Sequence, residues 1–255
     1  MLLVQRQELG RNSALFCRKG ASVLGLGRLK ERGERLERNS EELLGSITFY
    51  QIDVGKENEV RKFVEEFKTT YEKVDVLFNN AGVADVVIGP LSRISDDEWD
   101  RLFQTNLKSI YYMVNHCERL FNKNLAIVNN AAIVGTLKYP SALPAYSAAK
   151  AGIVALSKSM ASRYEKRKIR VNVIFPGPID TPLARKLYGS EEVFQRAFKQ
   201  HPRGSFRSPL EIAKAVYFLS SEHASYINGH NLIVDGGYTL SKKINNRTTL
   251  VKSLF

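Results

Sequence analysis

The feature that most constrains this chain is an alternation between short apolar runs of strand length and longer stretches with helical periodicity. Continuous apolar runs suit strands that are buried on both faces, as in parallel sheets. Seven runs are expected as strands: Leu2 to Val4, Ala21 to Leu26, Ile47 to Ile52, Val74 to Phe78, Leu125 to Asn129, Arg170 to Phe175 and Leu232 to Val234. Seven strands alternating with about six helices predict a doubly wound α/β fold, a parallel sheet with helices on both faces.

Local signals predict three of the helices. One amphipathic helix is expected where apolar residues recur at helical spacing: Val60, Phe63, Val64, Phe67 and Tyr71. A capping box at Ser95-Asp96-Asp97-Glu98 predicts the start of a long helix. Ser208 followed by Pro209 and Glu211 predicts another start, with Ser as the N-cap and Pro in the first turn.

Composition limits the class of protein. The 255 residues are 44% hydrophobic and 25% charged, which is typical of a globular protein and excludes disordered, collagen-like and membrane-spanning classes. The longest apolar opening, Met1 to Val4, is far shorter than the roughly 20 residues of a membrane helix. We therefore expect a cytoplasmic protein with no membrane partner, consisting of one domain over residues 1–240 and a tail over 241–255 without clear periodicity.

The net charge of +12 raises the question of an acidic or nucleic-acid partner. Between Arg28 and Arg38, however, basic residues alternate with three glutamates, which is typical of a solvated helix face. We therefore expect no nucleic-acid partner. Cys17 and Cys117 have no second Cys or His at metal-ligand spacing, so both are expected to be small buried side chains and no metal site is predicted.

In an open α/β sheet the ligand lies beyond the carboxyl ends of the strands, so motifs that directly follow strands carry the most information. Tyr146 and Lys150 follow the fifth strand at i, i+4 spacing, which places a phenol and an ammonium on one helix face. Such a cation favours phenolate, as a general acid/base near neutral pH requires. The same Tyr-x-x-x-Lys spacing occurs at Tyr164 and Tyr238, but only Tyr146 follows a buried strand and opens a helix rich in small residues.

Three further motifs occupy comparable places. Asn79-Asn80-Ala81-Gly82 follows the fourth strand, where small residues let a flat ligand approach the backbone; a plain turn is the alternative. Pro176-Gly177-Pro178-Ile179-Asp180-Thr181-Pro182 follows the sixth strand as a rigid turn with a hydroxyl and free amides, or a simple Pro-rich loop. Asn106 is a polar residue on an otherwise apolar helix face, either functional or a satisfied buried Asn.

In this order and spacing, these motifs resemble the short-chain dehydrogenase/reductase family, whose domain has a Rossmann-type fold. The resemblance runs from about Gly10 to Leu240. It includes Asp53-Val54, Gln104-Thr105-Asn106 and the closing Val234-Asp235-Gly236-Gly237.

The resemblance implies an NAD(P)-dependent oxidoreductase that transfers hydride between C4 of a nicotinamide and a small carbonyl or alcohol substrate. It implies that Tyr146 exchanges a proton with the substrate oxygen, that Lys150 holds the ribose hydroxyls and lowers the Tyr pKa, and that Asn106 positions a water. The cofactor contacts it implies besides Tyr146 and Lys150 are Gly10 near the pyrophosphate, Asp53 and Val54 at the adenine, Asn80, Ala81 and Gly82 on the adenosine side, and Pro176, Gly177, Ile179 and Thr181 at the carboxamide end.

Charge bears on the choice of cofactor. An acidic residue at the end of the second strand would accept a hydrogen bond from a ribose 2′-OH, but here the run is Leu26-Gly27-Arg28. A guanidinium in place of a carboxylate favours a 2′-phosphate, so NADP is predicted over NAD. The alternative is a surface Arg that caps a strand.

The sequence departs from the family pattern in two places. Relatives carry Thr-Gly-x-x-x-Gly-x-Gly after the first strand, whereas here Gln5 to Leu9 hold no glycine before Gly10 and the loop is about two residues shorter. Glu8 would place a carboxylate near the phosphates of the cofactor, and the positive charges of Arg6 and Arg11 would partly compensate for it. The family's Ser near the end of the fifth strand falls on Ala132, whose neighbours Asn130 and Thr136 would replace its hydroxyl only in a rearranged loop.

Two hypotheses follow. The first is an active carbonyl reductase or alcohol dehydrogenase; the second is a catalytically impaired relative that keeps the fold for binding or oligomerisation. The resemblance implies a homotetramer or homodimer. The stretch from Leu183 to Arg207 is expected to cover the substrate, and its basic residues either favour an acidic substrate or are simply solvated.

Overall fold

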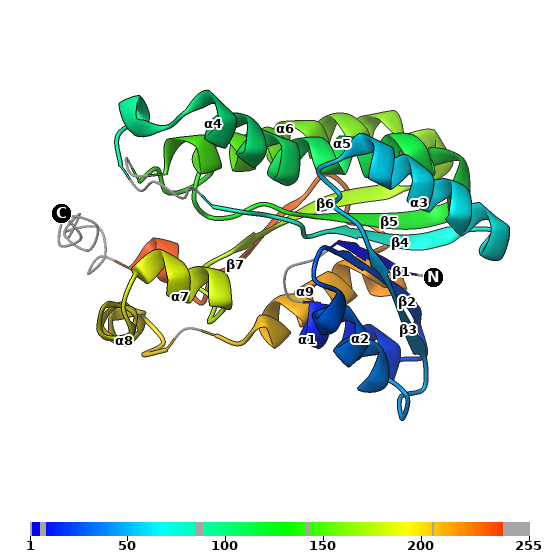
Figure 1. Cartoon of the computed structure of the whole chain (residues 1–255), viewed down its shortest axis with the longest axis horizontal. Helices are drawn as coiled ribbons and strands as arrows, with labels where there is room; N and C mark the ends of the chain where they lie inside the picture. Colours follow the sequence, from blue (N-terminus) through cyan, green and yellow to red (C-terminus); the bar gives the residue numbers. More distant parts are fainter. Residues whose placement is uncertain (1, 6–8, 85–88, 141–142, 206, 242–255) are drawn as a thin grey trace.

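A computed structural model describes residues 2–5, 9–84, 89–140, 143–205 and 207–241. Within these ranges seven strands form one parallel sheet in the order β3-β2-β1-β4-β5-β6-β7 (Figure 1). The strands are β1 Leu2–Gln5, β2 Ser22–Gly27, β3 Ser46–Gln51, β4 Val74–Asn79, β5 Phe121–Asn130, β6 Arg170–Pro176 and β7 Asn231–Val234. All seven predicted strands are confirmed, and so is the doubly wound α/β class.

Nine α-helices accompany the sheet in the part of the chain that is described. They are α1 Leu9–Arg18, α2 Lys30–Arg38, α3 Glu57–Thr70, α4 Asp96–Phe103, α5 Ser109–Cys117, α6 Pro144–Arg163, α7 Pro182–Tyr188, α8 Glu191–Gln200 and α9 Pro209–Ser220. The expectation of about six was too low for two reasons. The segment that begins at Ser95 is divided by a π-helical turn, and the segment after β6 contains the short helices α7 and α8.

The predicted helix starts are present. Ser95 Oγ accepts a hydrogen bond from Glu98 N at 3.2 Å, and Ser208 Oγ accepts one from Leu210 N at the same distance. These side chains satisfy amides that would otherwise lack a partner in the first turn. Of the five residues expected on the core face of α3, Val60, Phe63, Val64 and Phe67 are buried, whereas Tyr71 is the C-cap residue and packs only partly buried against the same core.

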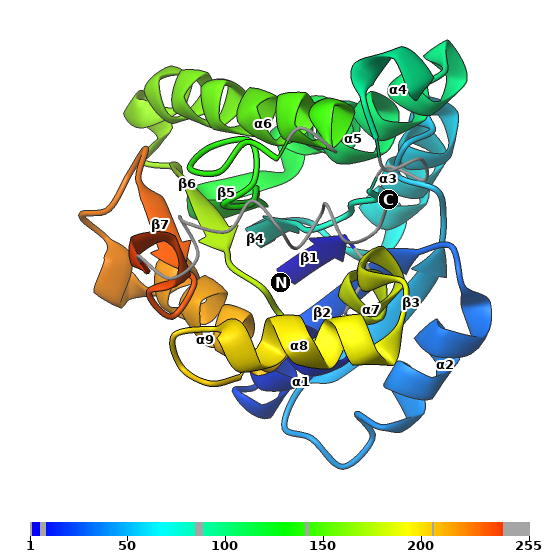
Figure 2. The same cartoon turned by 90° about the vertical axis from the view of Figure 1, so that its left-hand side faces the viewer.

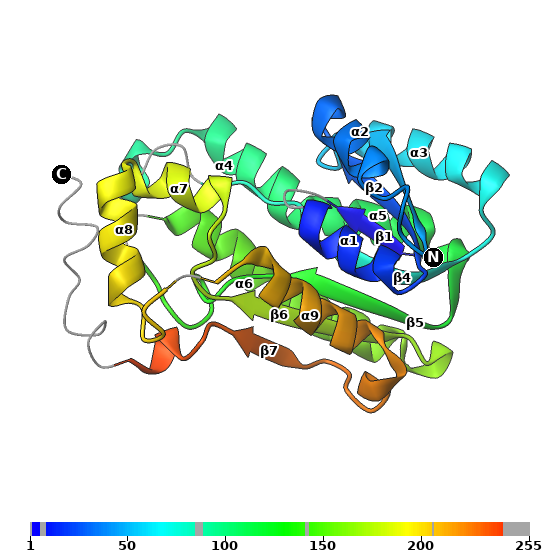
Figure 3. The same cartoon turned by 90° about the horizontal axis from the view of Figure 1, so that it is seen from below.

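The sheet separates two apolar cores because successive side chains of a strand point to opposite faces. Leu24 and Leu26 of β2 pack into one core with α3, α5 and α6, while Val23 packs into the other with α1 and α9. Figure 1 shows α3 to α6 above the sheet and α1, α2 and α9 below it, and Figure 3 shows α1 and α9 running across the lower face. Both faces are therefore covered, which explains the continuous apolar strands.

The strand order reverses at the centre of the sheet. From β1 the chain builds outward through β2 and β3, and then crosses to β4 on the other side of β1. Crevices at such switch points, beyond the carboxyl ends of the strands, are where open α/β sheets bind ligands. In Figure 2 the short helices α7 and α8 lie in front of the sheet.

Several expectations concern other parts of the chain. Both cysteines are buried free thiols, as predicted, and burial raises the pKa of Cys117 to about 12. None of the helices in the described ranges is long and apolar enough to cross a membrane. The predicted tail lies, from residue 242 on, outside the described residues, so the boundary at residue 240 stays a prediction.

Candidate active site

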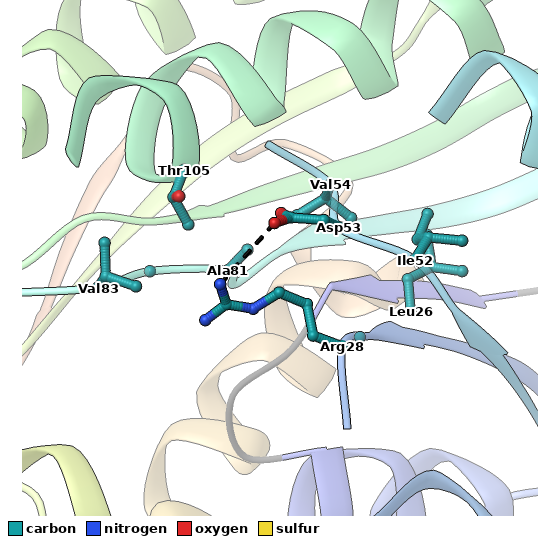
Figure 4. Close-up of a pocket in the computed structure, with 10 residues that line it drawn as sticks. Leu26, Arg28, Ile52, Asp53, Val54, Ala81, Val83 and Thr105 are labelled. Carbon is teal, nitrogen blue, oxygen red and sulfur yellow. Dashed lines mark ion pairs between the residues drawn. The ribbon is translucent and has the colours of Figure 1, made fainter. Parts of the chain in front are cut away.

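A pocket lies at the carboxyl ends of β2, β3 and β4. It is lined by Leu26, Gly27, Arg28, Ile52, Asp53, Val54, Ala81, Gly82, Val83 and Thr105 (Figure 4). Five of the predicted cofactor residues therefore line a single pocket: Arg28, Asp53, Val54, Ala81 and Gly82. Since most of the lining is aliphatic or glycine, the pocket suits a flat, largely apolar group such as a nucleobase.

Arg28 and Asp53 are the two charged residues of that lining, and they pair with each other. Arg28 Nη1 lies 3.8 Å from Asp53 Oδ2, and the ion pair spans the pocket in Figure 4. Asp53 Oδ1 also accepts a hydrogen bond from Gly55 N at 3.0 Å, which holds the carboxylate in place. The Arg28 side chain is 54% exposed, so its guanidinium lies at the mouth of the pocket.

Asn106 lies in the π-helical turn Gln104–Lys108 between α4 and α5, and it is fully buried. Its Oδ1 accepts a hydrogen bond from Val83 N at 2.7 Å and its Nδ2 donates to Val83 O at 2.9 Å. The site segment after β4 is therefore tied to the helix. A Cβ at Gly82 would lie 3.3 Å from Asn106 Oδ1 and 3.7 Å from Lys150 Nζ, so Gly82 leaves space in front of both.

Lys150 is a lysine with only 3% exposure, and it forms no salt bridge with any carboxylate in the part of the chain that the structure describes. Its Nζ donates to the carbonyl oxygen of Asn130 at 2.7 Å. Burial lowers the pKa of Lys150 to about 7. The ammonium lies 5.6 Å from the ring centroid of Tyr146, one turn earlier in α6, as the i, i+4 spacing predicted.

One contact escaped the sequence analysis. Asn130 Nδ2 donates to Asn80 Oδ1 at 2.5 Å, so an amide pair joins the ends of β4 and β5, while Asn130 Oδ1 is buried with no hydrogen-bond partner among the described residues. In the neighbouring pair, Asn79 Nδ2 donates a hydrogen bond to Asn129 Oδ1 at 2.7 Å. The matching Asn-Asn dipeptides at the ends of both strands were the signal that could have revealed this pairing.

The segment after β6 is held against β7 and the start of α9. Gly177 N donates to Val234 O at 3.0 Å, and a Cβ on Gly177 would lie 2.6 Å from that of Asp235, so only glycine fits there. Ile179 forms a β-bridge with Arg207. Thr181 Oγ1 accepts a hydrogen bond from Ala184 N at 3.0 Å and so caps α7. The predicted residues Pro176 to Thr181 therefore connect the carboxyl end of β6 to the start of α7.

Comparison with known proteins shows the family to which this chain belongs. The family model described as enoyl-(acyl carrier protein) reductase matches residues 7–239. A 3-oxoacyl-acyl-carrier-protein reductase of Thermotoga maritima is 32% identical over 89% of this chain and 91% of its own length. The chain belongs to the short-chain dehydrogenase/reductase family. The corresponding reductase of Chlamydia muridarum is 38% identical over 88% of this chain and 89% of its own.

Other members of the family are similar too. A cyclopentanol dehydrogenase of Comamonas testosteroni is 32% identical over 88% of this chain and 90% of its own length. Levodione reductase has the same fold, with a TM-score of 0.86 at 25% identity, covering 94% of this chain and 97% of its own. A short chain dehydrogenase of Bacillus anthracis gives 0.81 at 29% identity, with 94% and 97% covered. The named relatives are reductases and dehydrogenases, so the family to which this chain belongs is a family of oxidoreductases.

Two departures from the short-chain dehydrogenase/reductase pattern have a structural counterpart. β1 ends at Gln5 and α1 begins at Leu9, so Gly10 is already the second residue of the helix. Arg6 and Glu8 lie outside the described residues. Ala132 carries no hydroxyl, its carbonyl accepts from Thr136 Oγ1 at 2.6 Å, and the Nδ2 of Asn130 is bonded to Asn80. The Thr136 hydroxyl and the Asn130 side-chain amide, the two groups that could replace a Ser hydroxyl, therefore already donate hydrogen bonds within the protein.

The basic segment over the site is partly neutralised within itself. Arg185 bonds Asp180 at 2.8 Å and Glu191 at 2.7 Å. Its charge is therefore not available to an acidic substrate without breaking both pairs, which favours the solvated alternative for this residue. Arg203 and Arg207 flank the buried His201, with Arg203 N donating to His201 Nδ1 at 3.2 Å.

The residues present fit a nicotinamide dinucleotide at two places. The aliphatic pocket at the carboxyl ends of β2, β3 and β4 suits an adenosine. The buried Lys150 ammonium, whose Nζ lies close to Gly82 because that residue has no side chain, suits ribose hydroxyls. Both observations concern described residues, whereas most of the segment that would face the pyrophosphate, residues 6–8, is not described.

Proposed function

We propose that this chain is an NADP-preferring oxidoreductase that interconverts a carbonyl and an alcohol, with Tyr146 as the general acid/base. The observation that carries the proposal is the buried Lys150 ammonium 5.6 Å from the Tyr146 ring, with Gly82 leaving space in front of it. A group this well desolvated is unusual outside functional sites. The nicotinamide cofactor, when bound, supplies or accepts the hydride.

In this proposal the protein moves the proton. The Tyr146 phenol donates to the oxygen of a carbonyl substrate, or accepts the proton of an alcohol. A positive charge on Lys150 favours the phenolate and holds ribose hydroxyls through the remaining protons of Nζ. Because burial lowers the pKa of Lys150 to about 7, that support depends on pH near neutrality. Asn106 fixes Val83 and so positions the adjacent Gly82.

The second candidate function is a binding or oligomeric protein without turnover. It is favoured by two observations: the connection between β1 and α1 is only residues 6–8, and Ala132 offers no hydroxyl. Loss of one hydrogen-bond donor at a reacting oxygen typically costs about 10²–10³ in rate, which leaves room for slow catalysis. A cytoplasmic location and a homodimer or homotetramer belong to this proposal in either case.

Titration with NADPH and NADH, followed by nucleotide fluorescence and calorimetry, tests the proposal first. Micromolar NADPH binding with weaker NADH binding supports an active cofactor site, whereas no binding of either up to millimolar supports the second candidate. Turnover of a panel of carbonyls and alcohols then tests the chemistry. Tyr146→Phe should abolish it with NADPH affinity retained, and Tyr111→Phe, an exposed tyrosine of α5, should leave it unchanged.

A further inference from the structure

The ion pair between Arg28 and Asp53 lies at the pocket that is proposed to hold the adenosine, where it bears on which nucleotide the chain prefers. We propose that Asp53 is a specificity-determining residue that competes with a 2′-phosphate for Arg28, and so sets how strongly the chain prefers NADP over NAD. This inference rests on the proposed function for its choice of ligand. It does not rest on catalysis, because neither residue belongs to the Tyr146 and Lys150 centre.

Arg28 and Asp53 carry opposite charges, and they account for all the charge on the described residues that line the pocket. The other eight described lining residues carry no charge, so among the residues that the structure describes Asp53 is the one carboxylate and Arg28 the one cation that line the pocket. Among the residues that the structure describes, Asp53 is also the sole ion-pair partner of Arg28 within 4.0 Å. A ligand with a phosphate at this mouth therefore meets a guanidinium that is already shared with a carboxylate.

Asp53 is held rigidly, whereas the Arg28 side chain can move. Asp53 N donates to Glu59 Oε2 at 2.7 Å, and Asp53 Oδ1 accepts from Gly55 N, which leaves Oδ2 directed at Arg28. The backbone of Arg28 is also fixed, because its carbonyl accepts from Gln51 Nε2 at 3.2 Å. Its side chain, half exposed and 3.8 Å from the carboxylate, is too far for a hydrogen bond and free to turn outward.

The other charges near the pair are already engaged. Lys56 Nζ lies 3.0 Å from Glu59 Oε1, and that bond raises the pKa of Lys56, while the hydrogen bond from Asp53 N, followed by that from Lys56, lowers the pKa of Glu59. Lys56 therefore does not replace Arg28 as the partner of Asp53. When a 2′-phosphate draws Arg28 away, Asp53 is left with its Gly55 amide as the remaining bond and with a second anion nearby.

The geometry gives opposite expectations for the two nucleotides. A ribose 2′-OH leaves the ion pair intact, so Asp53 acts on the unphosphorylated nucleotide only through the adenine, which both nucleotides share. A 2′-phosphate must break the pair and approach a carboxylate. Exposed ion pairs without hydrogen bonds are weak, so the effect of Asp53 on a 2′-phosphate ligand is expected to be about two- to five-fold in Kd.

Calorimetric titration with adenosine 2′,5′-bisphosphate and adenosine 5′-monophosphate tests the inference, because these probes differ only in the 2′-phosphate and contain no nicotinamide. In the wild type the bisphosphate should bind more tightly. Asp53→Asn should raise the ratio of bisphosphate to monophosphate affinity about two- to five-fold, since both probes share the adenine beside Asp53, while Arg28→Gln should weaken the bisphosphate roughly ten-fold. In Arg28→Gln, the further change Asp53→Asn should have a smaller effect than in the wild type.

Matched controls are available on the surface. Asp100→Asn on α4 and Arg32→Gln on α2 change the net charge equally at exposed positions outside the pocket, and neither should alter the ratio of the two affinities. Thermal unfolding of each variant, measured without ligand, identifies any change that reflects lost stability rather than lost recognition.

The outcomes separate this inference from the proposed function. Equal binding of the two probes to the wild type, absence of binding, or an unchanged or lower ratio of bisphosphate to monophosphate affinity in Asp53→Asn overturns the inference, whether or not the protein turns over a substrate. The expected affinity pattern with no turnover of any carbonyl or alcohol supports the inference and counts against the oxidoreductase function.

Discussion

Asn106 forms two hydrogen bonds with the backbone of Val83, accepting from the amide at 2.7 Å and donating to the carbonyl at 2.9 Å. A buried Asn in a π-helical turn thereby satisfies the backbone amide and carbonyl of a residue just after β4. The sequence left open whether this Asn is functional or merely satisfied. The structure shows that it is satisfied and that it positions the site segment beside Gly82.

Replacing Asn106 should therefore destabilise the fold. Asn106→Leu leaves the amide and carbonyl of Val83 buried without partners, and each unpaired group costs about 1–3 kcal/mol. We expect the free energy of unfolding, measured by urea titration, to fall by about 2–4 kcal/mol. Asn58→Leu on the exposed side of α3 is the control, with an expected change below about 0.5 kcal/mol. Equal losses in both variants would contradict this role of Asn106.

The buried Lys150 predicts a pH dependence of stability. Its folded pKa of about 7 lies below the ordinary value of 10.5. Between these pH values the unfolded chain holds a proton that the folded chain lacks, so the free energy of unfolding rises with pH across that window. The burial penalty is fully present below pH 7 and is gone above 10.5.

Comparison with Lys150→Met isolates this effect. Relative to that variant, the wild type should gain stability from pH 7 upward, by at most about 1.4 kcal/mol per pH unit. Urea unfolding at several pH values between 6 and 10 measures the difference. Lys158→Met, at an exposed position of the same helix, should show no such divergence. A flat difference for Lys150→Met would show that the ammonium remains charged in the folded protein.

Gly135 controls the approach of the loop after β5 to the start of α6. Its φ is +82°, and a Cβ there would lie 2.2 Å from Ser147 O, next to Tyr146. Gly135→Ala should therefore cost about 3 kcal/mol or more, because backbone strain and overpacking add. Gly204→Ala has a similar φ of +66° but open space around its Cβ, so about 1 kcal/mol is expected. Thermal and urea unfolding compare the two, and a similar cost for both would contradict the close approach.

Ala132 offers a gain-of-function test. Ala132→Ser introduces a hydroxyl at the position that the family resemblance assigns to the missing Ser. If Tyr146 and Lys150 are competent, kcat should rise by up to about 10²–10³ at unchanged NADPH affinity. Ala131→Ser adds the same hydroxyl one residue earlier and should not raise kcat. No increase in the Ala132 variant, with cofactor binding intact, would place the deficiency elsewhere, first of all in the segment between β1 and α1.

The amino-acid sequence alone determined the order of the elements and the class of fold. Apolar runs of strand length, such as Leu125 to Asn129, suit strands that are buried on both faces, so a covered parallel sheet was predicted. Capping at Ser95 and Ser208 was predictable because those hydrogen bonds join residues two or three positions apart. Tyr146 and Lys150 were predictable for the same reason, since both lie on one helix.

Only the tertiary structure decided the contacts between elements. The pairing of Asn80 with Asn130, and of Arg28 with Asp53, joins residues 50 and 25 positions apart, and each depends on strand register and on where a strand ends. The near-complete burial of Lys150 likewise results from packing of α6 on the sheet. Hydrophobic periodicity specifies which face of an element is covered, whereas the partner of a polar side chain depends on the strands and loops that meet it in space.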